Sequence, residues 1–335
     1  MVKKQPIGNY GSGLNILVDI SDMKKTPKVA VIDLGTNTFH LLIAELLPGK
    51  EWHVLYKTKI TVKLGEGGIH LGVIAPRPYV RGLKALRKFS TVIKKYKVEE
   101  VYAFATSGIR STKNGSAFVR QVYQETGIKI RTIDGKKEAE LICQGVLQTL
   151  GAIHKPVLIM DIGGGSTEFI ITDQKKIYWK HSFDIGASRL KELFPLNDPI
   201  AKSKVVKLER YLFDILQPLK EALVQFPVTT LVGASGSFES FAKMIGYYKS
   251  GKNPIASRPT FDFIIKDYQH LHRKLISSAL SDRYQMKGLV KMRADMIVPA
   301  SIQVNLVLNE FQLKEMKLST HALKEGVLAQ LLQKY

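Results

Sequence analysis

Two stretches of the chain combine carboxylates with glycine-rich turns. In the first, apolar residues 157–160 lead into Asp161, three glycines follow, and Glu168 precedes a second apolar run at 169–172. This pattern predicts a strand, a tight turn and a second strand. Glycine lets a backbone approach a ligand closely, and the N–H groups of such a turn bind anions. A carboxylate at each end of the turn suits a divalent cation on a phosphate.

The second stretch repeats this arrangement earlier in the chain. Apolar residues 29–32 lead into Asp33, which occupies the same place as Asp161, and another turn and apolar run follow. The chain therefore carries the phosphate-turn pattern twice. We expect the terminal phosphates of a ligand to be held by the two turns, which consist of Gly35, Thr36, Asn37 and Thr38, and of Gly163, Gly164, Gly165 and Ser166.

Three further positions join strand ends to helix starts. Ser235 and Gly236 follow a predicted strand and open a helix, an arrangement that binds anions. Arg110 follows a strand and a turn of small residues, where it would meet a phosphate. Glu138 lies in the first turn of a predicted helix, where the helix dipole alone explains a glutamate. Spacing by itself therefore leaves the role of Glu138 open.

The glycine-rich segment 64–68 lacks the Gly-Lys-Ser/Thr ending of a P-loop, and is either a ligand flap or a connector. The predicted amphipathic helix 77–96 carries a basic face, which is either solvated or the wall of an anion-binding groove.

Length and charge indicate two domains and a polyanionic partner. A chain of 335 residues is long enough for two separate cores. Its 50 Lys and Arg against 29 Asp and Glu give a net charge of +21, which favours polyphosphate, nucleotides or other polyanions, although basic solvated faces would give the same balance.

The single cysteine excludes an internal disulfide and a thiolate metal cluster, and fits a reducing cytoplasm. No apolar run approaches the roughly 20 residues of a membrane helix. No motif for reading nucleic-acid sequence is present.

The remaining periodicity predicts an alternation of strands and helices. Pro218 is expected to kink or break helix 202–226, and Pro299 to interrupt helix 290–308. Near the C-terminus we expect a strand at 315–319 and a helix at 323–332.

Strand–turn–strand hairpins differ from the dinucleotide-binding layout, in which a helix follows the first turn. They resemble the actin, sugar-kinase and heat-shock-chaperone (ASKHA) superfamily, whose domains are ribonuclease-H-like. Within it, the chain resembles the exopolyphosphatase/guanosine pentaphosphate phosphatase (Ppx/GppA) family in its short two-domain form. The motifs that carry the resemblance, in order, are residues 31–40, 105–110 with Asn114, 138–141, 161–168, 233–236 and 323–328.

The resemblance implies an α/β protein with two actin-like domains and a cleft between them. We expect an N-terminal extension at 1–26, partly disordered, followed by actin-like domain I at 27–135 and domain II at 136–310. The strand and helix of 311–335 are expected to pack back on domain I. The chain ends too early for the additional helical His-Asp domain of longer family members.

The implied activity is metal-dependent hydrolysis of the terminal phosphoanhydride of inorganic polyphosphate, with release of orthophosphate. Glu138 is expected to be the base for the attacking water, with an ordinary pKa, and Arg110 to stabilise developing charge. Asp161 and Glu168 are implied as metal-associated carboxylates, Asp33 as a contributor through water, and Mg²⁺ or another divalent cation as the cofactor. Ser235 and Gly236 would line the far wall.

Three alternatives stay open. The first is a guanosine pentaphosphate (pppGpp) 5′-phosphohydrolase, which would use the same catalytic groups. The second is an ASKHA-type kinase, against which the Glu138 motif argues. The third is a non-catalytic regulator that binds polyphosphate or nucleotides. The resemblance also implies a homodimer, and neither a specific nucleic acid nor a membrane is an expected partner.

Overall fold

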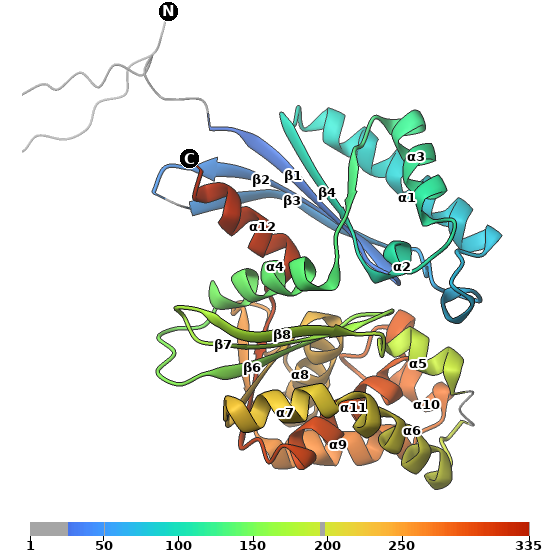
Figure 1. The fold of residues 1–335 in the computed structure, drawn as a ribbon, viewed down its shortest axis with the longest axis vertical. Helices are drawn as coiled ribbons and strands as arrows, with labels where there is room; N and C mark the ends of the chain where they lie inside the picture. The colour runs from blue at the N-terminus through green and yellow to red at the C-terminus, as the bar shows by residue number, and fades with distance from the viewer. Residues whose placement is uncertain (1–25, 50, 195–197, 335) are drawn as a thin grey trace, which may run out of the picture.

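The computed structural model describes residues 26–49, 51–194 and 198–334, so the N-terminal extension expected at 1–26 lies almost entirely outside the described residues. Two α/β halves are stacked with a layer of helices between their sheets, as Figure 1 shows. The expected α/β class with two halves is confirmed.

The first sheet has the order β3-β2-β1-β4-β5. Its first three strands form an antiparallel meander, and the other two run parallel to β1. Its strands are β1 (Lys28–Leu34), β2 (Thr38–Leu47), β3 (Glu51–Thr61), β4 (Glu100–Ala105) and β5 (Ile130–Thr132). The outer face of this sheet is covered by α1 (Pro76–Lys95) and α3 (Gly115–Thr126), with the one-turn helix α2 (Ser107–Arg110) after β4.

The second sheet has the order β10-β11-β9-β6-β7-β8 and repeats this plan, because β6, β7 and β8 form a meander and β9 runs parallel to β6. Its strands are β6 (Val157–Ile162), β7 (Thr167–Thr172), β8 (Ile177–Phe183), β9 (Thr230–Ala234), β10 (Thr260–Phe263) and β11 (Glu315–Ser319).

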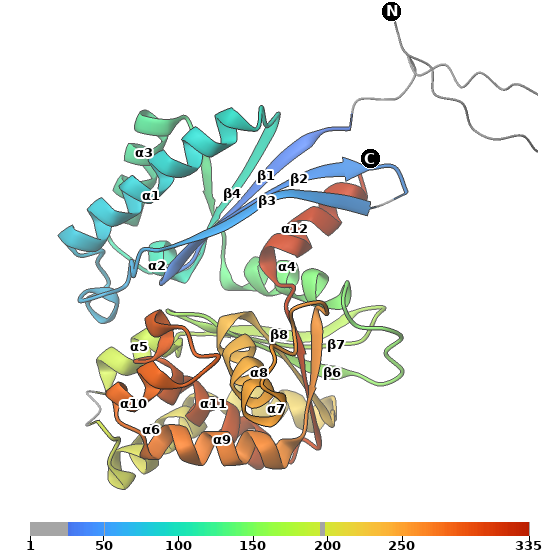
Figure 2. The same ribbon diagram turned by 180° about the vertical axis from the view of Figure 1, so that it is seen from behind.

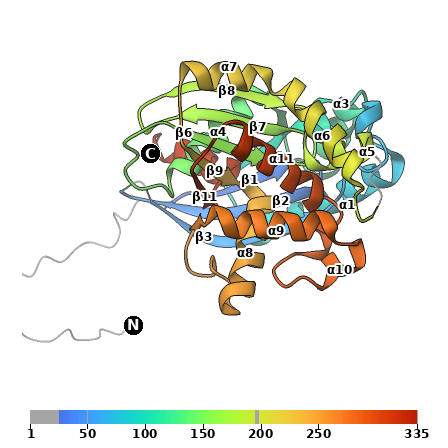
Figure 3. The ribbon, with the colours of Figure 1, turned by 90° about the horizontal axis from the view of Figure 1, so that it is seen from below.

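A bundle of helices covers the outer face of the second sheet, as the view from below in Figure 3 shows. The bundle contains α5 (Ala187–Leu193), α6 (Lys202–Ile215), α7 (Gln217–Gln225), α8 (Ser235–Ser250), α9 (Ile265–Ser277), α10 (Leu280–Gln285) and α11 (Ile297–Glu310). Among the described residues, the short 3₁₀ turns η2 (Ile69–Leu71) and η3 (Lys291–Arg293) lie in the connections.

Two helices, α4 (Gly135–Leu147) and α12 (Leu323–Leu332), fill the layer between the sheets (Figures 1 and 2). They cross at glycines: a Cβ at Gly145 would lie 1.9 Å from the Ala322 carbonyl oxygen, and one at Gly326 would lie 1.8 Å from that of Leu141. The two backbones are therefore in direct contact, and only glycine fits at either position.

Strand alternation turns both aspartates towards this middle layer. Val29 and Val31 of β1 pack into the same apolar cluster as α4 and α12, whereas the intervening side chains face the outer helices. Side chains two positions apart share a face, so Asp33 points inwards. The same alternation holds in β6, where Val157 and Ile159 face inwards and Asp161 follows them.

The strand and helix predicted at 315–319 and 323–332 form with those bounds. Pro218 marks the break between α6 and α7, as predicted. The interruption predicted at Pro299 is wrong: α11 begins at Ile297, so Pro299 lies in its first turn, where a missing N–H costs no hydrogen bond.

The prediction that the C-terminal strand packs on domain I is also wrong. β11 lies in the second sheet between β9 and β10, because Met316 and Leu318 are buried there and its backbone pairs on both sides. Only α12 continues to the first sheet, where it contacts β1.

No helix among the described residues is both long and apolar enough to span a bilayer.

Candidate active site

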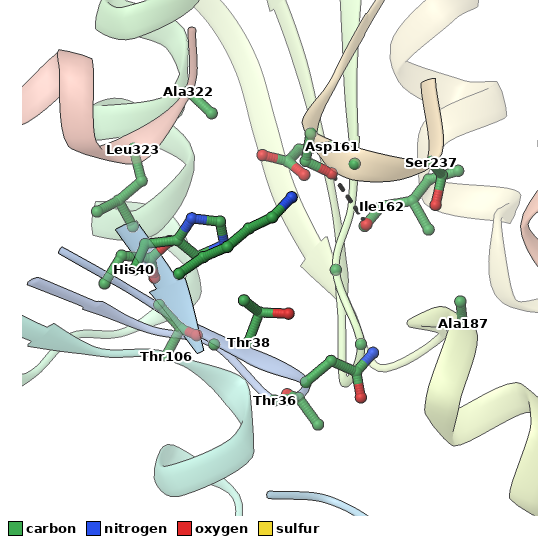
Figure 4. Close-up of a pocket in the computed structure, with 18 of the residues that line it drawn as sticks. Thr36, Thr38, His40, Thr106, Asp161, Ile162, Ala187, Ser237, Ala322 and Leu323 are labelled. Atoms are coloured by element: carbon green, nitrogen blue, oxygen red, sulfur yellow. Dashed lines mark hydrogen bonds between the residues drawn. The ribbon is translucent and has the colours of Figure 1, made fainter. Parts of the chain in front are cut away.

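A cleft of about 410 Å³ opens between the two sheets beside the α4–α12 layer. The two predicted phosphate turns and the β9–α8 junction line it. Figure 4 shows Thr36, Thr38 and His40 on the side of the first sheet, with Asp161 and Ser237 opposite them.

Matching rows of side chains cross the two meanders. In the first sheet, Asp33 pairs with His40 on β2, and His40 pairs with Lys59 on β3. In the second, Asp161 pairs with Glu168 on β7, and Glu168 pairs with Ser182 on β8. Paired residues on adjacent strands point to the same face. The duplicated hairpins thus present two rows of polar side chains to the same interior layer, a mixed row in the first sheet and an acidic row in the second.

The two phosphate turns approach each other closely across the cleft. A Cβ at Gly164 would lie 2.6 Å from the Asn37 side-chain nitrogen, and one at Gly165 would lie 2.6 Å from the Ser107 hydroxyl. The Asn37 side-chain oxygen accepts a hydrogen bond from the Ser188 hydroxyl at 2.7 Å. Glycine is therefore needed in the second turn to leave its N–H groups close to whatever the first turn holds.

At the third turn, Ser235 takes a left-handed conformation with φ of 65°, which is uncommon for a residue with a Cβ. Its hydroxyl donates to the Ile162 carbonyl at 3.1 Å, and its proximity to the Asp161 carboxylate lowers the pKa of that group. The strained turn thereby ties the start of α8 to the end of β6, next to Asp161.

Glu138, in the first turn of α4, is buried and lines the cleft. Arg110 donates to its carboxylate at 2.8 Å and to the Ile133 carbonyl at 3.0 Å. Burial and the nearby Glu168 carboxylate raise the pKa of Glu138 well above its ordinary range, and Arg110 opposes this rise. The prediction of an ordinary pKa for Glu138 is therefore wrong, because the sequence did not show how completely water is excluded from this helix start.

Glu168 is buried and accepts hydrogen bonds from the hydroxyls of Ser166 at 2.7 Å and Ser182 at 2.6 Å. Burial and the Asp161 carboxylate nevertheless raise the pKa of Glu168 to about 7. Burial likewise raises the pKa of Asp161 to about 6, and Asp33 adds to this rise. Burial raises the pKa of Asp33 too. Carboxylates that raise one another's pKa lie close together, and a cation between them would relieve their repulsion.

This donor set fits Mg²⁺ bound together with a phosphate. Within the described part of the chain, no three His, Cys, Asp or Glu side chains form a closed metal cage. Mg²⁺ is commonly held by one or two carboxylates, several waters and substrate oxygens. Asp33 and Asp161 would supply those carboxylates, whereas Glu168 is already engaged by two hydroxyls.

Lys324, in the first turn of α12, also lines the cleft and is only 8% exposed. Burial lowers the pKa of its ammonium group, but Glu325, Asp33, Glu239 and Asp161 together outweigh burial and raise it. Lys324 is therefore positively charged at neutral pH.

His40 lies between Asp33 and Lys59 in the row that crosses the first sheet. Burial, with the charges of Lys324 and Lys59 adding to it, lowers the pKa of His40 well below its ordinary range. The imidazole is therefore neutral at pH 7, and its surroundings are cationic.

The structure brings all but one of the predicted site residues to the cleft. The exception is Arg110, which is outside the cleft lining and donates to the Glu138 carboxylate. The glycine-rich segment 64–68 lies outside the cleft lining, and its Gly67 N–H donates to Glu192 of α5 at 2.8 Å, so it connects the two halves. The basic face of α1 is also outside the lining.

Sequence reasoning missed Lys59, Ser182 and Lys324. Lys324 had a visible signal, because it stands next to a glycine-containing helix start that otherwise reads as buried. Lys59 and Ser182 had none, since their positions depend on strand register.

Comparison with known proteins gives a consistent result. The model of the Ppx/GppA phosphatase family matches residues 42–335. A bifunctional 3-dehydroquinate synthase/phosphatase of Fusobacterium nucleatum is 32% identical over 84% of this chain, which spans 43% of that protein's length. Exopolyphosphatase 1 of Mycobacterium leprae is 25% identical, with 90% of this chain and 88% of that protein covered.

Among solved structures, an exopolyphosphatase from Cytophaga hutchinsonii superimposes with a TM-score of 0.89 at 36% identity, with 92% of this chain and 98% of that chain covered. A Ppx/GppA family member from Aquifex aeolicus gives a TM-score of 0.76 at 24% identity, with 92% and 98% covered, a likeness of fold.

Proposed function

This chain belongs to the Ppx/GppA phosphatase family, whose members are phosphoanhydride hydrolases, and we propose that it is an exopolyphosphatase that releases orthophosphate from the end of inorganic polyphosphate. The observation that carries the proposal is the buried Glu138 carboxylate, held by Arg110 at 2.8 Å, in a cleft that also contains two glycine-rich phosphate turns.

In the proposed reaction, the N–H groups of the turns that follow Asp33 and Asp161 bind oxygens of the terminal phosphate. Glu138 accepts a proton from a water as the water oxygen attacks the terminal phosphorus. The bond from phosphorus to the bridging oxygen breaks, and its electron pair leaves with the shortened chain. Little covalent chemistry is asked of the protein, since such transition states are loose and depend on positioning and charge.

The environment of Glu138 suits a base. Its raised pKa makes the carboxylate a stronger proton acceptor than a solvated glutamate, and the Arg110 contact opposes the rise so that the ionised form remains accessible. The double hydrogen bond from Ser166 and Ser182 fixes the Glu168 carboxylate beside it.

We propose Mg²⁺ or another divalent cation as cofactor, held by Asp33 and Asp161 together with phosphate oxygens. When bound, such an ion would neutralise charge on the phosphates and supply Lewis acidity.

The lining of the cleft favours polyphosphate over pppGpp. None of the described residues that line the cleft is Phe, Tyr or Trp. The lining does include four cationic side chains, Lys57, Lys59, Arg293 and Lys324. Proteins that bind nucleobases commonly stack them on aromatic side chains. A linear polyanion needs only cations and N–H donors, and the net charge of +21 agrees with such a partner.

Phosphate release tests this proposal directly. Purified protein would be assayed with Mg²⁺ on long polyphosphate, short polyphosphate and pppGpp at matched phosphate concentration, with EDTA as the control. We expect kcat/KM to be higher for polyphosphate and activity to disappear with EDTA. A higher kcat/KM for pppGpp would replace the proposal with the nucleotide alternative, and binding without release under any divalent metal would indicate a regulator.

The domain boundaries at 27–135 and 136–310, a homodimeric state and a cytoplasmic location are proposals as well. For the domain boundaries, the relevant observation is that α4 and α12 share one apolar cluster with residues of both sheets, so the two halves pack against a common layer.

A further inference from the structure

A second hollow, the α8–α9 groove, lies on the helical side of the second half. It has a volume of about 570 Å³ and is lined by α8, α9 and the connection that follows α10. Figures 2 and 3 show these helices among those that cover the second sheet. None of the described residues that line the groove also lines the catalytic cleft. Its size suits a small ligand, since such sites commonly measure roughly 300–1,000 Å³.

The groove has an apolar floor and an exposed aromatic pair. Met244, Ile245 and Leu271 are buried side chains of the lining. Tyr248, in the last turn of α8, is 74% exposed, and its ring stacks on the His270 imidazole with the ring centroids 6.0 Å apart and an angle of 29° between the ring planes. Because most of the tyrosine is exposed, the pair leaves ring surface open to a flat ligand.

The groove also carries a surplus of positive charge. Four exposed cationic side chains belong to its lining, Lys266, Arg273, Lys274 and Lys287. Among the described residues, no carboxylate lies within 4.0 Å of any of these four. Asp267, the only carboxylate among the described lining residues, already pairs with Lys249 at 2.7 Å. The lining is therefore complementary to an anion.

The spacing along α9 matches a flat ring that is joined to phosphates. Arg273 and Lys274 follow His270 by three and four positions, so they lie on the same face of the helix, roughly 5 Å further along its axis. A base stacked on Tyr248 would thus have its phosphates beside a guanidinium, which binds phosphate oxygens in pairs. An apolar ligand would leave these cations unused, and a base-free phosphate would leave the aromatic pair unused.

Two segments join the groove to the catalytic cleft. α8 carries Tyr248 in its last turn and begins at Ser235, which lines the cleft. The connection after α10 places Lys287 in the groove and, six positions later, Arg293 in the cleft lining. A Cβ at Gly236 would lie 1.7 Å from an Arg293 side-chain nitrogen, so the two segments touch at the cleft wall. A ligand that shifts either segment therefore alters that wall.

We propose that the α8–α9 groove is an effector site for a nucleoside triphosphate, whose base stacks on Tyr248 and whose phosphates bind Arg273 and the neighbouring cations. Binding there changes the affinity of the cleft for its substrate through α8 and the connection to η3. The binding site stands independently of the proposed exopolyphosphatase function, whereas the effect on the cleft rests on it.

Photolabelling with an ATP that carries an azide on its base, followed by peptide mapping, locates the base directly. We expect label on the peptides of α8 and α9 that contain Tyr248 and His270. Tyr248→Ala and Arg273→Met are the groove variants. Tyr123→Ala and Arg120→Met are the matched controls, because both residues are exposed on α3, three positions apart, and outside both linings. Circular dichroism would check that every variant is folded.

Displacement of the label measures affinity at the groove alone. The β,γ-imido analogue of ATP, which resists hydrolysis, should displace it at about tenfold lower concentration than ribose triphosphate, since only the former has a base to stack. Tyr248→Ala should reduce labelling of the groove by about tenfold for the same reason. Arg273→Met should weaken displacement by both compounds about tenfold, because a hydrogen bond to a charged group is lost. The controls should match the wild type.

The effect on the cleft is measured as KM for polyphosphate with Mg²⁺, with and without saturating imido analogue. We expect KM to change by about fivefold or more in the wild type and in both controls, and to stay unchanged in the two groove variants. An equal change of KM in the groove variants would mean that the nucleotide competes within the cleft, and would overturn the effector role.

Label confined to peptides of the cleft would overturn the groove as a nucleotide site. Equal displacement by ribose triphosphate and by the imido analogue would overturn the nucleotide as its ligand. A wild-type protein that releases no phosphate from polyphosphate would refute the proposed function, and the photolabel would still decide whether the groove binds a nucleotide.

Discussion

Gly326→Ala should separate the contribution of the α4–α12 crossing from that of the catalytic groups themselves. The added methyl carbon would start 1.8 Å from the Leu141 carbonyl oxygen, whereas real contacts of this kind are essentially never below 3.0 Å. The opposing atom is backbone, so it cannot rotate away. The helices must therefore move apart by roughly 1 Å or more.

This displacement reaches the site from two directions. α4 carries Glu138 one helical turn before Leu141, and α12 carries Lys324 two positions before Gly326. A misplacement of about 1 Å costs about 10²-fold in rate in other enzymes. Overpacking of a core costs roughly 1–3 kcal/mol, which lowers Tm by only a few degrees in a chain of this size.

The assay compares phosphate release with thermal melting at the same pH. We expect Gly326→Ala to lose about 10²-fold in kcat/KM at temperatures well below its own Tm. The matched control is Gly127→Ala at the end of α3, where φ is +73° and a Cβ would meet nothing within 4 Å. That variant is strained by about 1–2 kcal/mol but is remote from the cleft, so its activity should remain at the wild-type level.

Wild-type turnover by folded Gly326→Ala would refute the reasoning, because it would mean that the two helices can separate without moving Glu138. A parallel loss of activity in Gly127→Ala would also refute it, since general destabilisation would then explain both variants.

Three further predictions concern the carboxylates. Glu138→Gln should keep the fold and reduce phosphate release by about 10²–10⁴-fold, and near-wild-type turnover would remove Glu138 as the base. Arg110→Gln should move the acid limb of the pH–rate profile to higher pH, because Arg110 holds the pKa of Glu138 down and the base must be ionised; an unchanged limb would mean that another group limits the rate. Glu168 has a folded pKa of about 7 against an ordinary 4.5, so the folded state binds its proton more tightly and stability falls as pH rises between these values. In EDTA, Glu168→Gln should therefore raise Tm more at pH 8 than at pH 5, and an equal effect at both would contradict the buried charge.

The local sequence pattern was sufficient to predict the two hairpins that carry the phosphate turns. Apolar runs that end in Asp33 and Asp161 predicted both hairpins, and alternation explains why each aspartate faces the interior. The strand at β11 was found, but its sheet was not, because strand order depends on packing between distant segments.

The contacts within the site could not be predicted from the sequence, because they also depend on packing between distant segments. The Arg110–Glu138 pair joins residues on α2 and α4, and no spacing rule places two such side chains in contact. The raised pKa of Glu138 depends on burial by both halves. The position of Lys324 in the cleft depends on the crossing of α12 with α4, where Gly145 and Gly326 contact backbone, and the sequence showed only a glycine-containing helix start beside it.

The two meanders differ in how well their cleft residues tolerate substitution. β3 is an edge strand of the first sheet, so changes at Lys57 or Lys59 disturb only one neighbouring strand. The acidic row lies inside the second sheet, where Glu168 on β7 has a paired strand on each side, β6 and β8. The charge on the β3 wall of the cleft can therefore be changed by substitution while the buried carboxylates of the second meander keep their positions.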